Sequence, residues 1–122
     1  MKPIYSRSVC SAPFLSQATT AHGFLFVSGQ INLDVNGKLV GDSVTTQFAQ
    51  IMSNVTAILN AAQATLSNVV KATIYVTDLA DAPKINELWL TYFSQPMPAR
   101  EMVQVAALPL GATIEVSVIA KI

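Results

Sequence analysis

Arg100 and Glu115 are the residues of this 122-residue chain whose types and settings best suit chemistry. Arg100 enters a strand-like run at residues 101–105 and lies beside apolar residues of the chain. A guanidinium is always charged and presents a fork of N–H donors, so among apolar residues it requires an anion such as a carboxylate. Glu115 lies within a second strand-like run of β-branched residues, 113–118. We therefore take these two charges as the candidate site.

A structural ion pair between Arg100 and Glu115 is the simplest alternative. If the last two strands formed a tight hairpin about Pro109-Leu110, Arg100 would oppose a residue near Ile119. Arg100 would then lie about 13 Å along the strand from Glu115, because a strand rises about 3.3 Å per residue. Either another strand lies between them, or a second subunit supplies the partners. Both arrangements leave the guanidinium free to receive a ligand carboxylate.

Other catalytic classes lack the residues that they need. A single histidine, His22, excludes a His-based metal cluster and would have to carry any serine or cysteine triad alone. The single cysteine, Cys10, cannot form an internal disulfide, and we expect an idle thiol rather than a nucleophile. No glycine-rich phosphate loop occurs. Ser28-Gly29-Gln30 interrupts an apolar strand, where glycine permits either the close approach of a ligand or a simple bulge.

The composition indicates one domain over residues 1–122, with small molecules or proteins as partners. Seven Lys and Arg balance seven Asp and Glu, so the chain lacks the basic surface that binds nucleic acids or anionic membranes. A hydrophobic content of 52% is high for a small monomer and favours oligomerisation. No apolar run resembles a secretory signal or a spanning helix, so we expect a cytoplasmic protein.

The first half of the chain predicts strands followed by a long helix. Aromatic and aliphatic residues at 24–30 predict a buried strand that is closed by a turn signal at 34–37, and minor strands are expected near 4–5 and 38–40. After the N-cap candidates Asp42-Ser43, apolar residues recur at 3- and 4-residue spacing. This spacing predicts an amphipathic helix.

The second half predicts a strand, a helix and two further strands. Alternation at 70–76 is typical of a strand with one face against a core. Asp81 begins a second helix, whose inner apolar stripe includes Trp89. Strands at about 99–106 and 113–120 complete the order β-β-α-β-α-β-β.

Two helices can cover only one face of such a sheet, because right-handed crossovers place both helices on the same side. The other face should be bare, and we expect subunits to pack there with clefts between them. Its expected side chains are a mixed set: Lys71, Thr73, Tyr75, Arg100, Met102, Gln104, Glu115 and Ser117.

Several motifs follow one another in an order shared with a known family. They are Ser16-Gln17-Ala18, residues 23–31, Asn86, Pro98-Ala99-Arg100, residues 103–112 and Ile114-Glu115. Together they resemble the Rid family of reactive intermediate deaminases, also called YjgF, over nearly the whole chain. The resemblance implies an α+β fold similar to chorismate mutase of the Bacillus type, with two helices on one face of a mixed sheet. It also implies a homotrimer with clefts between its subunits.

The resemblance implies hydrolysis of reactive 2-imino and 2-enamino acids, such as 2-aminoacrylate and 2-iminobutanoate, to 2-keto acids and ammonia. No cofactor is implied. Arg100 would bind the substrate carboxylate and Glu115 would position the attacking water, which is chemically sound because the first fixes the substrate and the second accepts a proton. Positions that line or support the cleft in this family match Ser28, Gly29, Gln30 and Asn86.

Two residues depart from the family pattern. Leu15 stands where many deaminating members have a tyrosine, and Met102 stands where they often have a cysteine. Both belong to the expected substrate pocket, so that pocket should be more apolar, with lower activity or a preference for larger side chains. The second hypothesis is a binding or regulatory module that senses keto acids or amino acids without turnover. A ribonuclease, a label that some members carry, is disfavoured by the neutral charge.

Overall fold

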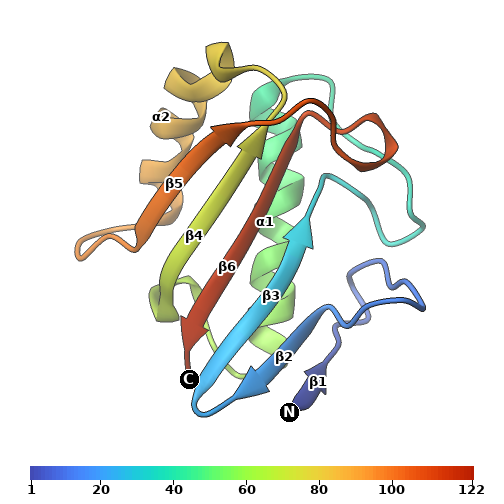
Figure 1. The fold of residues 1–122 in the computed structure, drawn as a ribbon, viewed down its shortest axis with the longest axis vertical. Helices are drawn as coiled ribbons and strands as arrows, with labels where there is room; N and C mark the ends of the chain where they lie inside the picture. Colours follow the sequence, from blue (N-terminus) through green and yellow to red (C-terminus); the bar gives the residue numbers. More distant parts are fainter.

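Six strands form one mixed sheet in the computed structural model, which describes all residues 1–122 (Figure 1). The strands are β1 (Lys2–Ile4), β2 (Ala18–Ala21), β3 (Phe24–Gln30), β4 (Val69–Val76), β5 (Ala99–Gln104) and β6 (Ile114–Lys121). Their spatial order is β1-β2-β3-β6-β4-β5. Strands β4 and β5 are parallel, because a helix connects them, and all other neighbours are antiparallel.

Two α-helices, α1 (Val44–Ala61) and α2 (Ala82–Tyr92), lie on one face of the sheet, behind it in Figure 1. Helix α1 begins with a capping box, in which the Ser43 hydroxyl accepts from the Thr46 backbone N–H and the Thr46 hydroxyl accepts from the Ser43 backbone N–H. Helix α2 has Pro83 in its first turn, where a backbone N–H has no helical partner. Three short 3₁₀ helices, η1 (Leu66–Asn68), η2 (Leu79–Asp81) and η3 (Pro109–Gly111), complete the structure.

This architecture confirms the α+β fold class with two helices on one face of a mixed sheet. Strand β2 was not predicted, because Ala18-Thr19-Thr20-Ala21 contains no large apolar residue. The signal that could have located it is the two-residue turn His22-Gly23, whose φ values of 50° and 81° suit a tight hairpin to β3. The minor strand expected at 38–40 amounts to one bridge, between Leu33 and Leu39.

The core lies between the helices and the sheet. Helix α1 contributes a fully buried stripe that includes Phe48, Ile51 and Val55, and the alternating residues of β4 and β6 meet it from the sheet. Burying one side chain of this size contributes roughly 1.5–3 kcal/mol, so the stripe holds α1 firmly on the sheet. No helix combines the length and the apolar character needed to cross a membrane.

The register of β5 corrects one prediction about the bare face. Arg100 pairs with Ala72, and Met102 pairs with Ile74, across the parallel β4–β5 ladder. Ala72 and Ile74 are fully buried toward the helices. Arg100, Met102 and Gln104 therefore face the helix side, and their predicted place on the bare face was wrong. The reason is that β5 is an edge strand beneath α2, where polar residues can occupy inward positions without entering the core.

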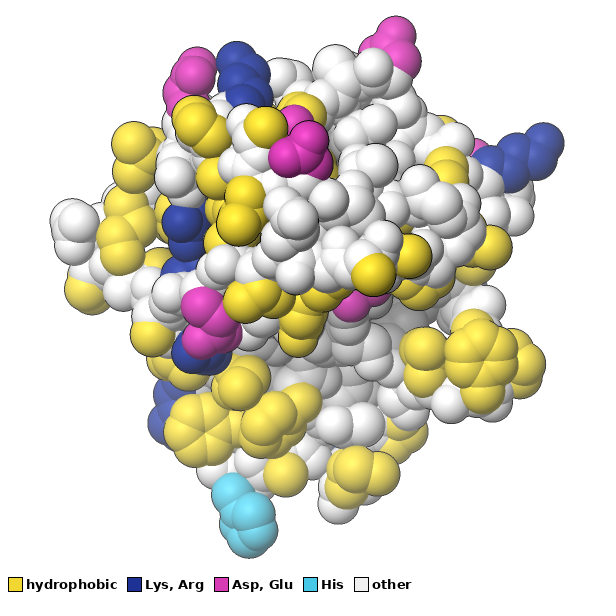
Figure 2. Space-filling view, turned by 45° about the horizontal axis from the view of Figure 1, so that its top comes forward, with side chains coloured by type: hydrophobic (Ala, Val, Ile, Leu, Met, Phe, Trp, Pro, Cys, Tyr) yellow, Lys and Arg dark blue, Asp and Glu magenta, His cyan; other side chains and the backbone are white.

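The bare face carries a polar cluster among exposed aromatic and aliphatic residues. Glu101 accepts from the Lys71 ammonium at 2.7 Å and from the Thr73 hydroxyl at 2.6 Å. Phe26 and Val103 on the same face remain exposed. Figure 2 shows hydrophobic side chains around a hollow in the middle of the side that it presents. Packing of subunits on this face stays a prediction.

One buried side chain holds the segment between β1 and β2, which carries Leu15. The Gln17 amide nitrogen lies within hydrogen-bond distance of the Ser6 carbonyl at 3.2 Å, the Val9 carbonyl at 3.1 Å and the Ser11 hydroxyl at 3.0 Å. Its amide oxygen accepts from the Ser6 backbone N–H at 2.7 Å. Gln17 is 1% exposed, and its bond to the buried Val9 is shielded from water, while its bonds to Ser6 and Ser11 are partly buried. The segment depends on this anchor for its conformation.

We expect Gln17→Leu to destabilise the fold, because it retains the volume of the side chain but leaves buried backbone groups unpaired. The free energy of unfolding, measured by urea denaturation, should fall by about 2–4 kcal/mol. Gln47→Leu is the control, since Gln47 is partly exposed and its two hydrogen bonds are long, at 3.3 and 3.4 Å. The control should change stability by less than about 0.5 kcal/mol. Equal losses in the two variants would contradict the anchoring role.

Candidate functional site

Helix α2 holds the guanidinium of Arg100 from two directions. Its Nη2 donates to Asn86 Oδ1 at 2.6 Å, and its central carbon lies 5.1 Å from the centroid of the Trp89 ring. Asn86 and Trp89 are three residues apart and therefore share one face of α2. Neither ion pair of the chain includes Arg100. The guanidinium thus has a neutral hydrogen-bond partner and an aromatic face, but no counter-charge.

The surroundings of Arg100 favour an added anion. Partial burial lowers the pKa of the guanidinium through desolvation, although arginine stays protonated in proteins. A surface cavity of about 370 Å³ opens beside it, lined largely by apolar groups. A carboxylate entering this cavity would meet a cation that has no counter-charge, and a charge-assisted hydrogen bond is stronger than a neutral one.

Glu115 lies on the bare face of β6, against the backbone of β3. A Cβ added to Gly29 would be 2.5 Å from Glu115 Oε2 and 2.8 Å from its Cδ, so only glycine gives the carboxyl group its place. The β3–β6 register shifts between Val27 and Gln30, which shows that the glycine permits both a bulge and a close approach. Burial raises the pKa of the Glu115 carboxyl group, which forms no ion pair within the chain.

A cavity of about 410 Å³ opens beside Glu115. Leu15, Gly29 and Gln30 line it together with Glu115, and most of its remaining lining is apolar, including Leu110. Leu110 has a φ of 59°, a left-handed conformation that is uncommon for a bulky residue. The cavity therefore places one carboxylate at an apolar surface.

The structure brings the predicted site residues together in two groups rather than one. Leu15, Gly29 and Gln30 accompany Glu115, whereas Asn86 accompanies Arg100. Ser28 supports the first group, since its hydroxyl donates to the Ser16 carbonyl at 2.6 Å and its N–H to the Gln17 carbonyl at 2.9 Å. Met102 lies on the helix side, packed against the hydrophobic core.

Arg100 and Glu115 do not pair within one chain. Strand β4 lies between β5 and β6. An intervening strand was one of the two arrangements predicted from the sequence. Glu115 is aligned with Tyr75 and, through it, with Val103. Arg100 is three residues further along and two strands across, about 10 Å in each direction, and it is on the opposite face of the sheet. A site that uses both charges would have to combine two copies of the chain.

The contact between Trp89 and Arg100 was not predicted from the sequence. Trp89 was expected on the inner stripe of α2, and the residue is indeed buried. The i, i+3 spacing from Asn86 was visible in the sequence. It became informative only once β5 was known to lie beneath α2. No three His, Cys, Asp or Glu side chains lie close enough together to hold a metal ion.

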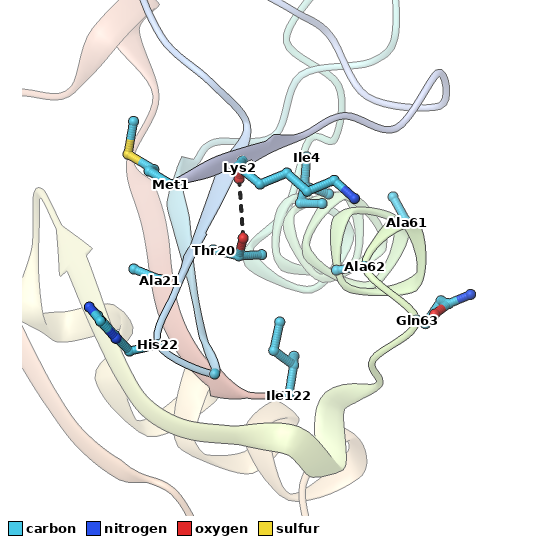
Figure 3. Close-up of a pocket in the computed structure, with 11 residues that line it drawn as sticks. Met1, Lys2, Ile4, Thr20, Ala21, His22, Ala61, Ala62, Gln63 and Ile122 are labelled. Atoms are coloured by element: carbon cyan, nitrogen blue, oxygen red, sulfur yellow. Dashed lines mark hydrogen bonds between the residues drawn. The ribbon is translucent and has the colours of Figure 1, made fainter.

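A larger groove, of about 740 Å³, lies beside β1, the β2–β3 turn and the C-terminal end of α1, and contains none of the predicted site residues. Figure 3 shows the Lys2 side chain extending toward Ala61 and Ala62 at the end of α1. The only hydrogen bond drawn there runs from the Thr20 hydroxyl to the Lys2 carbonyl, at 3.5 Å. Lys2 and His22 provide the only titratable side chains of its lining.

Comparison with known proteins identifies close relatives over most of the chain. The family model described as Endoribonuclease L-PSP matches residues 6–122. Reactive Intermediate Deaminase A, chloroplastic, of Arabidopsis thaliana is 47% identical over 86% of this chain, which spans 57% of that relative's length. The 2-iminobutanoate/2-iminopropanoate deaminase of Mus musculus is 41% identical over 86% of this chain and 78% of its own length.

Solved structures agree with the fold throughout. RidA from the Antarctic bacterium Psychrobacter sp. superposes with a TM-score of 0.94 at 35% identity, covering 100% of both chains. E. coli TdcF with bound serine superposes with a TM-score of 0.91 at 31% identity, covering 100% of this chain and 99% of its own. These values establish similarity of both sequence and fold.

We expect Asn86→Asp to give Arg100 an internal counter-charge. The free energy of unfolding near pH 7 should rise by up to about 1 kcal/mol, as for other exposed pairs. The pKa of the new carboxyl group would be lowered, so the gain should be complete above its unfolded pKa of about 3.9 and lost as the pH falls below it. Urea denaturation across this pH range measures the effect.

The same variant should bind small carboxylates more weakly, because the new carboxylate then neutralises the charge of Arg100. Calorimetric titration with pyruvate tests this, and Asn86→Ala is the control that removes the hydrogen bond without adding charge. An affinity for pyruvate that is unchanged in Asn86→Asp would show that Arg100 is not the anion anchor.

Proposed function

Since this chain belongs to the endoribonuclease L-PSP family, we propose that it hydrolyses reactive 2-imino acids to 2-keto acids and ammonia. The observation that carries the proposal is the guanidinium of Arg100, which is fixed by Asn86 and Trp89 yet has no counter-charge. The names of the Arabidopsis and mouse relatives, both deaminases, support it.

In this proposal Arg100 binds the carboxylate of the substrate. One Nη2 hydrogen is used by Asn86, and the remaining N–H groups of the fork are available for two parallel hydrogen bonds to the carboxylate oxygens. Such a bidentate contact fixes the plane of the substrate, since C1, C2 and the imine nitrogen are conjugated. Orientation of this kind lowers the barrier by converting a bimolecular encounter into an ordered one.

Glu115 is the proposed base that activates water. The water oxygen attacks C2 of the imine, one water proton passes to the Glu115 carboxylate, and the imine nitrogen takes up a proton to give a tetrahedral 2-amino-2-hydroxy acid. The Glu115 carboxyl group then returns its proton to the amino nitrogen, the C–N bond breaks as ammonia leaves, and the remaining hydroxyl proton passes to solvent to give the 2-keto acid. The raised pKa of Glu115 suits this role, because a base works best when its pKa approaches the operating pH.

Two copies of the chain are needed for the two charges to act together. Within one chain they occupy opposite faces of the sheet, and the exposed Phe26 and Val103 on the bare face are suited to burial by a partner. We therefore propose that a cleft between copies joins the Arg100 group of one to the Glu115 group of another. A homotrimer, as the resemblance implies, would supply three such clefts.

A binding module without turnover is the second candidate function. It is favoured by Leu15, which offers no hydroxyl to the cavity beside Glu115, and by the TdcF structure, which is described as holding serine. Ribonuclease activity, which the family description names, has less support, since the net charge of zero provides no excess of cations for a phosphate backbone. The experiments below separate these functions.

The first test couples the purified protein to threonine dehydratase and follows the imine with a semicarbazide trap. We expect the protein to accelerate formation of 2-oxobutanoate. Arg100→Ala should raise the Kd for 2-oxobutanoate by about 10- to 100-fold, the value of a charge-assisted pair. Glu115→Gln should retain binding but slow turnover by about 100-fold or more.

Arg7→Ala is the control, because Arg7 is exposed and is far from both groups in the sequence. This variant should leave the Kd for 2-oxobutanoate and the rate of turnover unchanged. Binding of 2-oxobutanoate without any acceleration would favour the binding module. Cleavage of RNA by protein free of contaminants, abolished in Arg100→Ala, would favour the ribonuclease.

The pH dependence of turnover should identify Glu115 as the base. Only the ionised carboxylate accepts a proton, so kcat/KM should fall as the pH is lowered through the pKa of this group. Because burial raises that pKa, the fall should be centred above about 4.3, the ordinary value for glutamate. The measurement is kcat/KM against pH after subtraction of uncatalysed hydrolysis. The residual activity of Glu115→Gln should lack this limb, and an unchanged limb in that variant would assign the pKa to another group.

A further inference from the structure

We infer that Trp89 is a positioning residue for ligand binding, whose indole face restrains the Arg100 guanidinium. The inference deepens the proposed function, on which it rests for the identity of the ligand as a 2-imino or 2-keto acid. It assigns to Trp89 a role beyond that of a core residue.

The contact has the geometry of a cation–π interaction. The central carbon of the guanidinium lies 5.1 Å from the ring centroid, within the range of about 6 Å in which the attraction is significant. Trp89 is only 5% exposed, so little water competes for its ring. A desolvated site strengthens the interaction.

The indole ring is itself held rigidly. Phe93 stacks on it with centroids 4.1 Å apart and an interplanar angle of 23°. Because a ring has two faces, the stacked Phe93 leaves the other face to Arg100. Phe93 is also buried, and both residues belong to the hydrophobic core. The contacts therefore run from the hydrophobic core through Phe93 to Trp89, and from Trp89 to the guanidinium.

Asn86 and Trp89 restrain different movements of the same group. The hydrogen bond to Asn86 Oδ1 directs one N–H of the fork, whereas attraction to the ring limits movement of the guanidinium away from α2. Neither contact neutralises the charge. The remaining N–H groups are thus restrained before a ligand arrives, and a carboxylate binds them with little further loss of conformational freedom.

The cavity around Arg100 fits the same ligand. Leu90, Met97 and Pro98 line it together with Trp89, so the guanidinium is bordered by apolar surface. Such surroundings suit a small planar carboxylate with an apolar side chain better than a hydrated inorganic anion. The positioning role of Trp89 therefore predicts an effect on affinity that a purely structural role would not produce.

Calorimetric titration with 2-oxobutanoate, combined with kcat and KM from the coupled assay, tests the inference. Trp89→Leu should raise both Kd and KM about tenfold, within the range of a desolvated cation–π contact, while kcat changes by less than about twofold. Trp89→Phe keeps a weaker aromatic face and should give an intermediate rise of about threefold.

Phe48→Leu is the control, because it removes a fully buried ring whose aromatic partner is Tyr92 rather than Trp89. It should lower the melting temperature, yet leave Kd within about twofold of the unmodified protein. Equal rises of Kd in Phe48→Leu and Trp89→Leu would overturn the inference, since affinity would then follow general packing.

Trp89 is the only tryptophan of the chain, so its fluorescence provides a readout that needs no substitution in α2. Titration of the unmodified protein with 2-oxobutanoate should change the emission with the Kd found by calorimetry, and Arg100→Ala should abolish the change. Calorimetric binding without any change in emission would contradict the inference even if Trp89→Leu failed to fold.

The outcomes also distinguish this inference from the proposed function. If Trp89→Leu binds 2-oxobutanoate normally while Arg100→Ala does not, the positioning role is wrong and the anion anchor stands. If Arg100→Ala also binds normally, Arg100 does not bind the substrate carboxylate and the proposed function is contradicted.

Discussion

The parallel pairing of β4 with β5 is the constraint on which the candidate site depends. It aligns Arg100 with Ala72, a residue buried toward the helices, and so turns the guanidinium toward α2. A shift of one residue would reverse every side chain of β5 and place the arginine on the bare face instead. The hydrogen bond that Arg100 donates to Asn86 and its contact with the Trp89 ring both follow from this one register.

Both charged groups are maintained at some expense of stability. Arg100 is partly desolvated without a counter-charge, and the Glu115 carboxyl group is held in a position that burial disfavours when it is ionised. A fold selected only for stability would pair such charges or replace them with apolar residues. Gly29 adds to this pattern, because its hydrogen atom is the only side chain that fits against Glu115. Local departures from stabilising rules of this kind are typical of functional positions.

The sequence predicted where the strands and helices lie along the chain better than it predicted which face of the sheet each side chain occupies. The strands at 24–30 and 70–76, the Ser43 cap of α1, the start of α2 after Asp81 and the separation of Arg100 from Glu115 followed from apolar periodicity, capping residues and the rise of a strand. The Asp81 side chain itself forms no capping hydrogen bond. The face of β5 did not, because an edge strand beneath a helix end has no clear alternation between apolar and polar residues. Strand β2 lacked large apolar residues, and the contact of Trp89 with Arg100 joins elements whose adjacency only the tertiary structure reveals.

Gln17 anchors the β1–β2 segment mainly through backbone atoms, so the conformation of this segment depends little on its other side chains. Three of the four contacts of Gln17 are with backbone atoms, namely the N–H and carbonyl of Ser6 and the carbonyl of Val9. Backbone atoms are present whatever the side chains are. Residues of the segment that line the cavity beside Glu115, such as Leu15, can therefore be exchanged over evolution while the path of the chain is preserved. One buried glutamine would thus allow the same scaffold to acquire new ligand preferences without having to fold anew.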